Sequence, residues 1–174
     1  MNQEILQEIL RQDYTKIQQD ITSFLKNQIS QKKAEGVVFG LSGGIDSVIV
    51  AYLSAKIFGK NALALVMPDS RVSPSSETGD ALKVIGELGR DYKLIDIDEI
   101  HKIYSNYLEP DELALGNLRA RIRSNIIYYY ANLKNLLVLG TSDKSEYLIG
   151  YFTKFGDGSA DILPTVSLLS LIHI

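Results

Sequence analysis

Short apolar runs alternate with longer segments in which apolar residues recur at spacings of three and four. The short runs predict strands over residues 37–41, 62–67, 92–97 and 136–139. The run 62–67 is apolar at every position, as in a parallel strand buried on both faces. The spaced pattern predicts helices, and Gly36 is expected to end the first of them. These helices cover residues 4–33, 45–58, 77–88, 99–107 and 111–134.

Regular alternation of strands and helices predicts an α/β fold with a parallel sheet and helices on both faces. We expect one domain over residues 1–174, because the length suits a single core and no repeat or linker interrupts it. Ligands of such sheets bind beyond the carboxyl ends of the strands, where the strand order reverses. The polar loops after the predicted strands 37–41, 62–67 and 136–139 are therefore the candidate site.

The segment 42–47, Ser-Gly-Gly-Ile-Asp-Ser, lies between a predicted strand and a predicted helix. Its glycines allow unusual dihedrals and close approach of the backbone to a ligand. The following helix N-terminus favours an anion, so the segment predicts a phosphate site. Asp46 would repel a phosphate unless a divalent cation lies between them. The alternative interpretation is a Ser/Gly turn in which Asp46 is an ordinary acid at a helix start.

Composition narrows the class of protein. The chain has no cysteine, which excludes disulfides, thiolate metal sites and cysteine nucleophiles and fits a cytoplasmic enzyme. Its formal net charge is −3, so no nucleic-acid partner is expected. No apolar run has the ~20 residues of a membrane span. We therefore expect a globular protein whose ligands are small molecules.

A second polar segment, 140–146, follows the last predicted strand. Thr141 is placed to reach a nucleotide, and Glu146 could provide a second carboxylate for the cation at Asp46. Alternatively, Ser142 or Asp143 caps a helix and Glu146 is a first-turn acid. The next segment, 151–161, combines glycines with charged residues, and a surface turn is the alternative for it.

Three arginines at positions 119, 121 and 123 alternate along the long predicted helix. Residues two apart point to different sides of a helix, so the three do not form one cluster. An arginine fork suits a phosphate or a carboxylate. We expect at least two of the three to be solvated or ion-paired.

The segment 42–47 resembles the SGGxDS signature of PP-loop ATP pyrophosphatases, and three further segments extend this likeness. Residues 39–47, 116–123, 138–146 and 150–161 together resemble bacterial NAD synthetase, ammonia-dependent. The resemblance implies a Rossmann-like fold of the adenine nucleotide alpha-hydrolase type. It implies ATP-dependent amidation of deamido-NAD (nicotinic acid adenine dinucleotide) with ammonia, giving NAD, AMP and pyrophosphate through an acyl-adenylate. It also implies Mg²⁺ as cofactor and a homodimer.

The resemblance carries residue roles as well. It implies ATP contacts at Gly40, Leu41, Ser42, Gly43, Gly44, Ile45, Asp46, Ser47 and Thr141. It implies Mg²⁺ ligands at Asp46 and Glu146, and deamido-NAD contacts at Arg121, Lys154 and Asp161. The resemblance assigns no further catalytic side chain.

The resemblance fades after residues 161–164. Family members continue through several helices with another ATP-binding lysine and threonine and a substrate-binding His-Lys pair, whereas residues 165–174 are an apolar tail. We therefore expect the C-terminal part of the family domain to be missing after about residue 164. Two alternatives stay open: another PP-loop ligase, and a truncated, non-catalytic nucleotide-binding or dimerising fragment.

Overall fold

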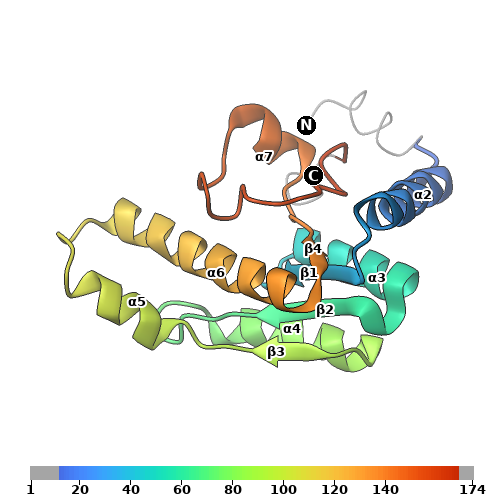
Figure 1. The fold of residues 1–174 in the computed structure, drawn as a ribbon. Helices are drawn as coiled ribbons and strands as arrows, with labels where there is room; N and C mark the ends of the chain where they lie inside the picture. The colour runs from blue at the N-terminus through green and yellow to red at the C-terminus, as the bar shows by residue number, and fades with distance from the viewer. Residues whose placement is uncertain (1–11, 169–174) are drawn as a thin grey trace.

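A computed structural model describes residues 12–168, and the first part of the predicted helix 4–33 lies outside this range. A parallel sheet lies between two layers of helices (Figure 1). The elements are α2 (Tyr14–Lys32), β1 (Gly36–Gly40), α3 (Ile45–Phe58), η1 (Gly59–Asn61), β2 (Ala62–Val66), α4 (Ser75–Leu88), β3 (Tyr92–Leu94), α5 (Asp98–Ser105), α6 (Glu112–Lys134), β4 (Leu136–Val138) and α7 (Lys144–Ile149).

The four strands of the sheet lie in the order β3-β2-β1-β4, and each neighbouring pair is parallel. The chain moves outward from β1 through β2 to β3, then crosses back by α5 and α6 to place β4 beside β1. The strand order therefore reverses between β1 and β4. Both predicted polar loops, 42–47 and 140–146, leave the sheet at this point, as the sequence pattern predicts.

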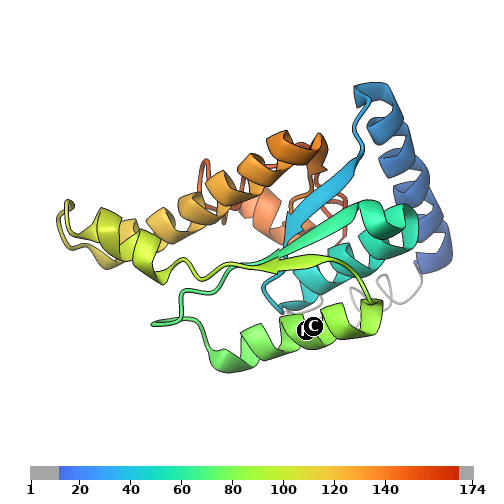
Figure 2. The same ribbon diagram turned by 60° about the horizontal axis from the view of Figure 1, so that its bottom comes forward.

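Alternate residues of each strand contact opposite helical layers, which explains why the central strands are apolar throughout. Val37 and Phe39 of β1 pack with α2, α3 and α4, whereas Val38 packs with α6. In Figure 2, α6 lies over one face of the sheet and α4 under the other. The predicted fold class, a parallel sheet covered on both faces, is confirmed.

Two local expectations differ from the structure. Helix α2 ends at Lys32 because Lys33 adopts the left-handed conformation and its N–H bonds the carbonyls of Ile29 and Ser30. Gly36 instead opens β1, where a Cβ would lie 2.0 Å from the Asn61 carbonyl oxygen. Strand β3 is also shorter than the predicted 92–97, although Ile95 and Ile97 still donate to the carbonyls of Val66 and Pro68.

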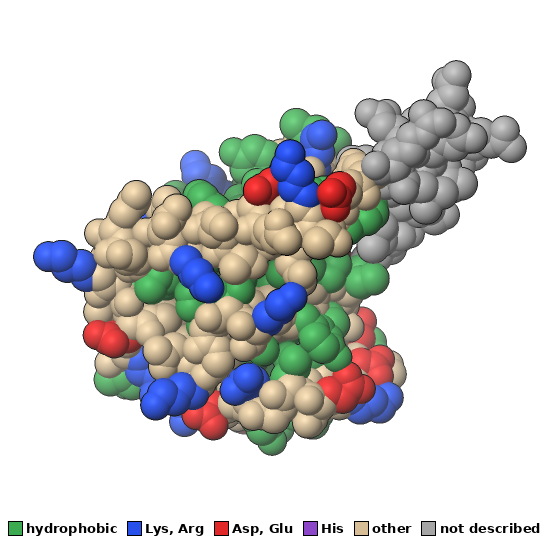
Figure 3. Space-filling view, turned by 90° about the vertical axis from the view of Figure 1, so that its right-hand side faces the viewer, with side chains coloured by type: hydrophobic (Ala, Val, Ile, Leu, Met, Phe, Trp, Pro, Cys, Tyr) green, Lys and Arg blue, Asp and Glu red, His purple; other side chains and the backbone are tan. Residues whose placement is uncertain are grey.

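Lysine and arginine side chains are spread singly, not gathered in one patch, over the face shown in Figure 3. Within the described part of the chain, none of the helices combines the length and the apolar character needed to cross a membrane.

Candidate functional site

The loop after β1 is built around a glycine, Gly43, that other residues could not replace without strain. Gly43 has φ +96°, and a Cβ on it would lie 2.4 Å from the Glu77 carbonyl oxygen of α4. Ser47 donates from Oγ to the Gly44 carbonyl at 2.8 Å, and its Oγ lies 3.1 Å from that of Ser42. Gly44 is the N-cap of α3 and provides no side-chain acceptor for the first turn. A closed loop at an N-terminus without a capping side chain is the arrangement that binds phosphate.

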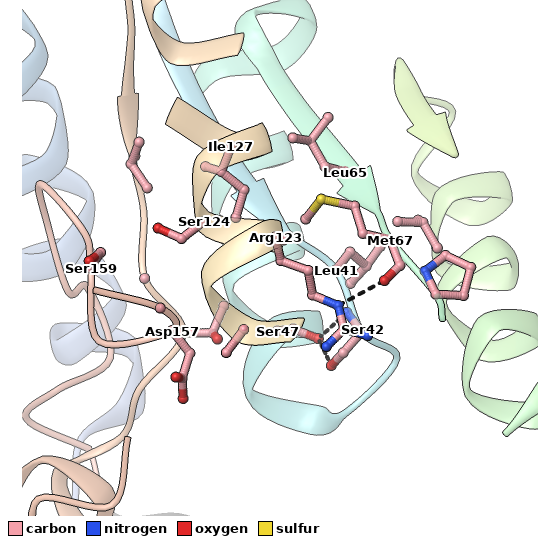
Figure 4. A pocket seen from close by; sticks show the side chains of 18 of the residues that line it. Leu41, Ser42, Ser47, Leu65, Met67, Arg123, Ser124, Ile127, Asp157 and Ser159 are labelled. Carbon is pink, nitrogen blue, oxygen red and sulfur yellow. Dashed lines mark hydrogen bonds between the residues drawn. The ribbon is translucent and has the colours of Figure 1, made fainter. Parts of the chain in front are cut away.

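A cavity of about 380 Å³ lies between this loop, the carboxyl ends of the strands and α6 (Figure 4). Ser42 and Ser47 line it from the β1 side, Met67 and Pro68 from β2, and Thr141 from β4. Segment 153–159 and the middle of α6 complete its wall. Four loop segments far apart in the sequence therefore form, with α6, one cavity of mixed polar and apolar lining, as is typical of small-molecule sites.

Two of four acidic side chains that lie near one another at this end of the sheet are the predicted cation ligands. Burial raises the pKa of Glu146, and the negative charges of Asp143, Asp46 and Asp157 raise it further. Glu146 and Asp46 thus lie close enough to repel each other, so a divalent cation would be favourable there. Among residues 12–168, no three His, Asp or Glu side chains are arranged to hold a metal without further ligands.

Glu146 also has a structural role, as the alternative interpretation proposed. Asp143 caps α7 by accepting from the Glu146 N–H at 2.8 Å, while the Glu146 carboxylate accepts from the Asp143 N–H at 3.4 Å. This reciprocal pair is a capping box. The 3.4 Å bond is long, so the capping role does not exclude a ligand role for Glu146.

The three residues assigned to deamido-NAD by resemblance lie outside the lining of the cavity. Arg121 is exposed and donates from Nε to the Lys154 carbonyl at 3.1 Å. The Lys154 ammonium lies 5.2 Å from the Phe155 ring centroid. Asp161 accepts from the Val138 N–H at 2.8 Å and so extends the edge of β4. The structure brings Arg121 beside Lys154 and places Asp161 at the sheet, and their role as substrate contacts stays a prediction.

Of the three α6 arginines, Arg119 is ion-paired and Arg121 exposed, while Arg123 lines the cavity. The expectation that at least two would be solvated or paired is therefore confirmed. Arg119 and Arg123 are four residues apart and both reach the segment after β2. The alternation signalled that the arginines differ in direction, but it did not identify the one facing the cavity.

Sequence analysis also missed a charged cluster behind the cavity wall. Asp69 is fully buried, and its Oδ2 accepts from Arg119 Nε at 2.6 Å. Burial alone would raise the pKa of Asp69, but Arg119 and Arg71 together hold it below its ordinary value. His101 is also buried, with Nδ1 3.9 Å from Asp69 Oδ2.

Asp69 also shapes its own loop. Its N–H donates to Ser73 Oγ at 3.0 Å, and its carbonyl accepts from the N–H groups of Val72 and Ser73. Ser73 lines the cavity. The only sequence signal was an acid directly after Pro68 at the end of a strand, which is too common to identify the cluster.

The sequence profile of the family described as NAD synthase matches residues 17–170. The chain is 47% identical over 171 residues to an NH(3)-dependent NAD(+) synthetase of Staphylothermus marinus, covering 94% of this chain and 61% of that protein. It is 48% identical to the protein of the same name from Hyperthermus butylicus, covering 91% of this chain and 59% of that one. The chain thus spans about three fifths of the length of these curated relatives.

Solved structures of NAD synthetase and NMN synthetase have a fold similar to that of this chain. An NH3-dependent NAD synthetase from Campylobacter jejuni has a TM-score of 0.87 at 39% identity, covering 91% of this chain and 69% of that one. An NMN synthetase from Francisella tularensis has a TM-score of 0.83 at 37% identity, covering 88% and 65%. The curated relatives named above are archaeal, so the family is supported but its restriction to bacterial enzymes is not.

Proposed function

This chain belongs to the NAD synthase family, and from that membership we propose that it takes part in ATP-dependent amidation of deamido-NAD with ammonia, giving NAD, AMP and pyrophosphate. The observation that carries the proposal is the cavity at the reversal of strand order. There the loop 42–47 and the end of β4 present Ser42, Ser47 and Thr141 to one ligand. Such an enzyme is a ligase of NAD biosynthesis and would work in the cytoplasm.

The residues present fit the nucleotide half of this reaction. Ser42 supplies a hydroxyl group, Ser47 holds the loop closed by donating to the Gly44 carbonyl, and the first turn of α3 supplies backbone N–H groups for the phosphates of ATP. Holding the nucleotide there orients its α-phosphorus for attack by the carboxylate of deamido-NAD. This attack forms the acyl-adenylate and breaks the bond between the α-phosphorus and the bridging oxygen, so that pyrophosphate leaves. Ammonia then attacks the acyl carbon, the C–O bond to AMP breaks as the C–N bond forms, and the nitrogen loses one proton to give the amide.

Asp46 and Glu146 would hold Mg²⁺, because their mutual repulsion is relieved by a cation. When bound, Mg²⁺ supplies positive charge against the negative charge of the phosphates. The loop 151–161 would then face the bound deamido-NAD, and Arg121, Lys154 and Asp161 would contact this substrate. A homodimer, as the resemblance implies, completes the proposal.

Incubation of the chain with ATP, Mg²⁺, ammonium and deamido-NAD tests the function, with AMP and NAD separated by chromatography. Formation of both products in equal amounts is expected for the proposed ligase. AMP without NAD would show that ATP is cleaved without amide formation, which would contradict the proposed ligase, and neither product despite ATP binding would leave another PP-loop ligase with a different acceptor as one alternative. Binding of ATP with neither product would support the alternative of a non-catalytic nucleotide-binding fragment.

A parallel assay tests which acceptor the chain prefers, because one similar structure is named an NMN synthetase. Nicotinic acid mononucleotide should be offered beside deamido-NAD under the same conditions. Preference for the dinucleotide supports the proposal. Preference for the mononucleotide would move the chain toward the activity for which the Francisella protein is named.

A further inference from the structure

Arg123 is the arginine that shares the cavity with the phosphate loop. It lies in the middle of α6 and lines the cavity together with Ser42 and Ser47. Figure 4 shows its side chain pointing from α6 toward the end of the cavity where Met67 and these serines lie. Its Nε donates to the Met67 carbonyl at 2.8 Å, which holds the guanidinium against the end of β2.

The rest of the guanidinium has no acceptor among residues 12–168. An arginine has five N–H donors, and the Met67 carbonyl uses one of them. No carboxylate of the described chain lies within ion-pair distance of Arg123, because Asp69 is bound to Arg119 at 2.6 Å instead. The bond to the end of β2 therefore uses one donor, and the terminal amino groups of this half-buried side chain are left for solvent or for a ligand in the cavity.

The charge of Arg123 is poorly compensated. Burial and the like charge of Arg119 lower the pKa of Arg123, and the negative charges of Asp69 and Glu77 offset this lowering only in part. An arginine remains charged in a protein even so. Arg123 is half-buried, so its charge is only partly solvated, and an anion that enters the cavity would be a favourable partner for it.

Building on the proposed function, we propose that Arg123 binds the phosphate chain of the nucleotide with its terminal amino groups. The phosphate loop lies in the same cavity, and a planar guanidinium suits two phosphate oxygens. The hydrogen bond to the Met67 carbonyl holds the guanidinium in position before the nucleotide binds. Arg121 plays no part in this contact, because it is exposed and lies outside the cavity lining.

Calorimetric titration of the 174-residue chain with ATP and, separately, with adenosine tests the assignment. Arg123→Gln removes the charge and keeps a polar side chain of intermediate length. Its ATP affinity should fall about tenfold or more, the range of a charged hydrogen bond, while its adenosine affinity stays within about twofold of wild type. Lys134→Gln, which removes a charge from the exposed last turn of the same helix, should change neither affinity.

The ratio of the two losses decides between roles. Equal losses for ATP and adenosine would show that Arg123 only shapes the pocket, and an unchanged ATP affinity would show no contact; either overturns the assignment. If Arg123→Gln does not fold, Arg123→Lys is titrated in its place. It keeps the charge but replaces the planar guanidinium, which has separate donors for Met67 and for a phosphate, with a single ammonium group, so it should lose ATP affinity selectively. A wild-type chain that binds no ATP would contradict the proposed function itself.

Discussion

At the residue scale, the two glycines of the phosphate loop have different requirements. Gly43 has a positive φ and touches the backbone of α4, whereas Gly44 has φ −68° and its Cβ would come no closer than 3.4 Å, to Ser42 Oγ. Gly43→Ala should therefore displace the loop from α4 and abolish ATP binding. Gly44→Ala, the matched control, should remain folded with the loop in place.

The measurement for both glycine variants is ATP titration together with thermal unfolding. A strained φ costs about 1–3 kcal/mol, and the clash with Glu77 adds to it, so Gly43→Ala should unfold at clearly lower temperature. Equal behaviour of the two variants would contradict the interpretation of this loop.

The Glu146 carboxylate is expected to lower the stability of the folded protein when it is ionised and to strengthen the binding of a cation. Its pKa is raised by burial and by neighbouring acids, so the folded protein binds this proton more tightly than the unfolded chain does. Stability should then decrease as pH rises from the ordinary value of 4.5 through the raised folded value. Glu146→Gln removes this decrease while glutamine still accepts in the capping box.

Urea unfolding at a series of pH values checks the sign. Glu146→Gln should be as stable as wild type or more stable at neutral pH in the absence of cation, and Mg²⁺ should bind it more weakly in the presence of ATP. Glu99→Gln, an exposed acid of α5, should leave Mg²⁺ affinity unchanged. Unaltered Mg²⁺ affinity in Glu146→Gln would remove this residue from the cation site.

At the scale of elements, Asp69 joins the segment after β2 to α6. Arg119 donates to its fully buried carboxylate at 2.6 Å, and Arg71 adds a second positive charge. Asp69→Asn leaves Arg119 without its counter-charge and should cost about 3 kcal/mol, as when one side of a buried pair is removed. Urea unfolding at neutral pH measures the loss.

The pH dependence gives this prediction a second test. The pKa of Asp69 is lowered, so its stabilising contribution is fully present above the ordinary value of 3.8 and is lost as pH falls through the folded value. Asp69→Asn should lack this part of the acid dependence. Asp80→Asn, from an exposed pair with Lys83, should keep the wild-type profile. If Asp69→Asn keeps the pH dependence of stability of the wild type, the stabilising role of the Asp69–Arg119 ion pair is excluded.

At the scale of the whole molecule, α6 carries more apolar surface than its own sheet covers. Tyr128 and Tyr130 pack against the core, but Tyr129 is 62% exposed and Leu133 61% exposed. A second copy covering these residues would account for them, in line with the proposed homodimer. Sedimentation at micromolar concentration should show a dimer, and Tyr129→Lys with Leu133→Lys should shift it to monomer. Phe24→Lys, on the opposite layer, should not.

A monomeric wild-type chain at that concentration would contradict the dimer. The double variant should also keep the wild-type circular dichroism spectrum, because both side chains are exposed in the isolated chain. Loss of the spectrum would show that these residues stabilise the fold itself.

The sequence alone determined the features that depend on near neighbours. The strand 37–41, the glycines and the helix from Ile45 to Phe58 are consecutive, so apolar spacing and backbone preference were enough to predict β1, the loop and α3. Gly36 was assigned to a helix end because a glycine there is locally favourable. Its actual constraint is contact with Asn61, which lies on another element.

Only the tertiary structure decided features that depend on residues far apart in the chain. The return of β4 to the side of β1 creates the cavity, and no local pattern encodes that crossing. Arg119, Arg121 and Arg123 look alike in sequence, yet one meets a buried carboxylate, one lies on the surface and one lines the cavity. Direction and surroundings, not residue type, set what a charged side chain binds, and both come from packing between elements.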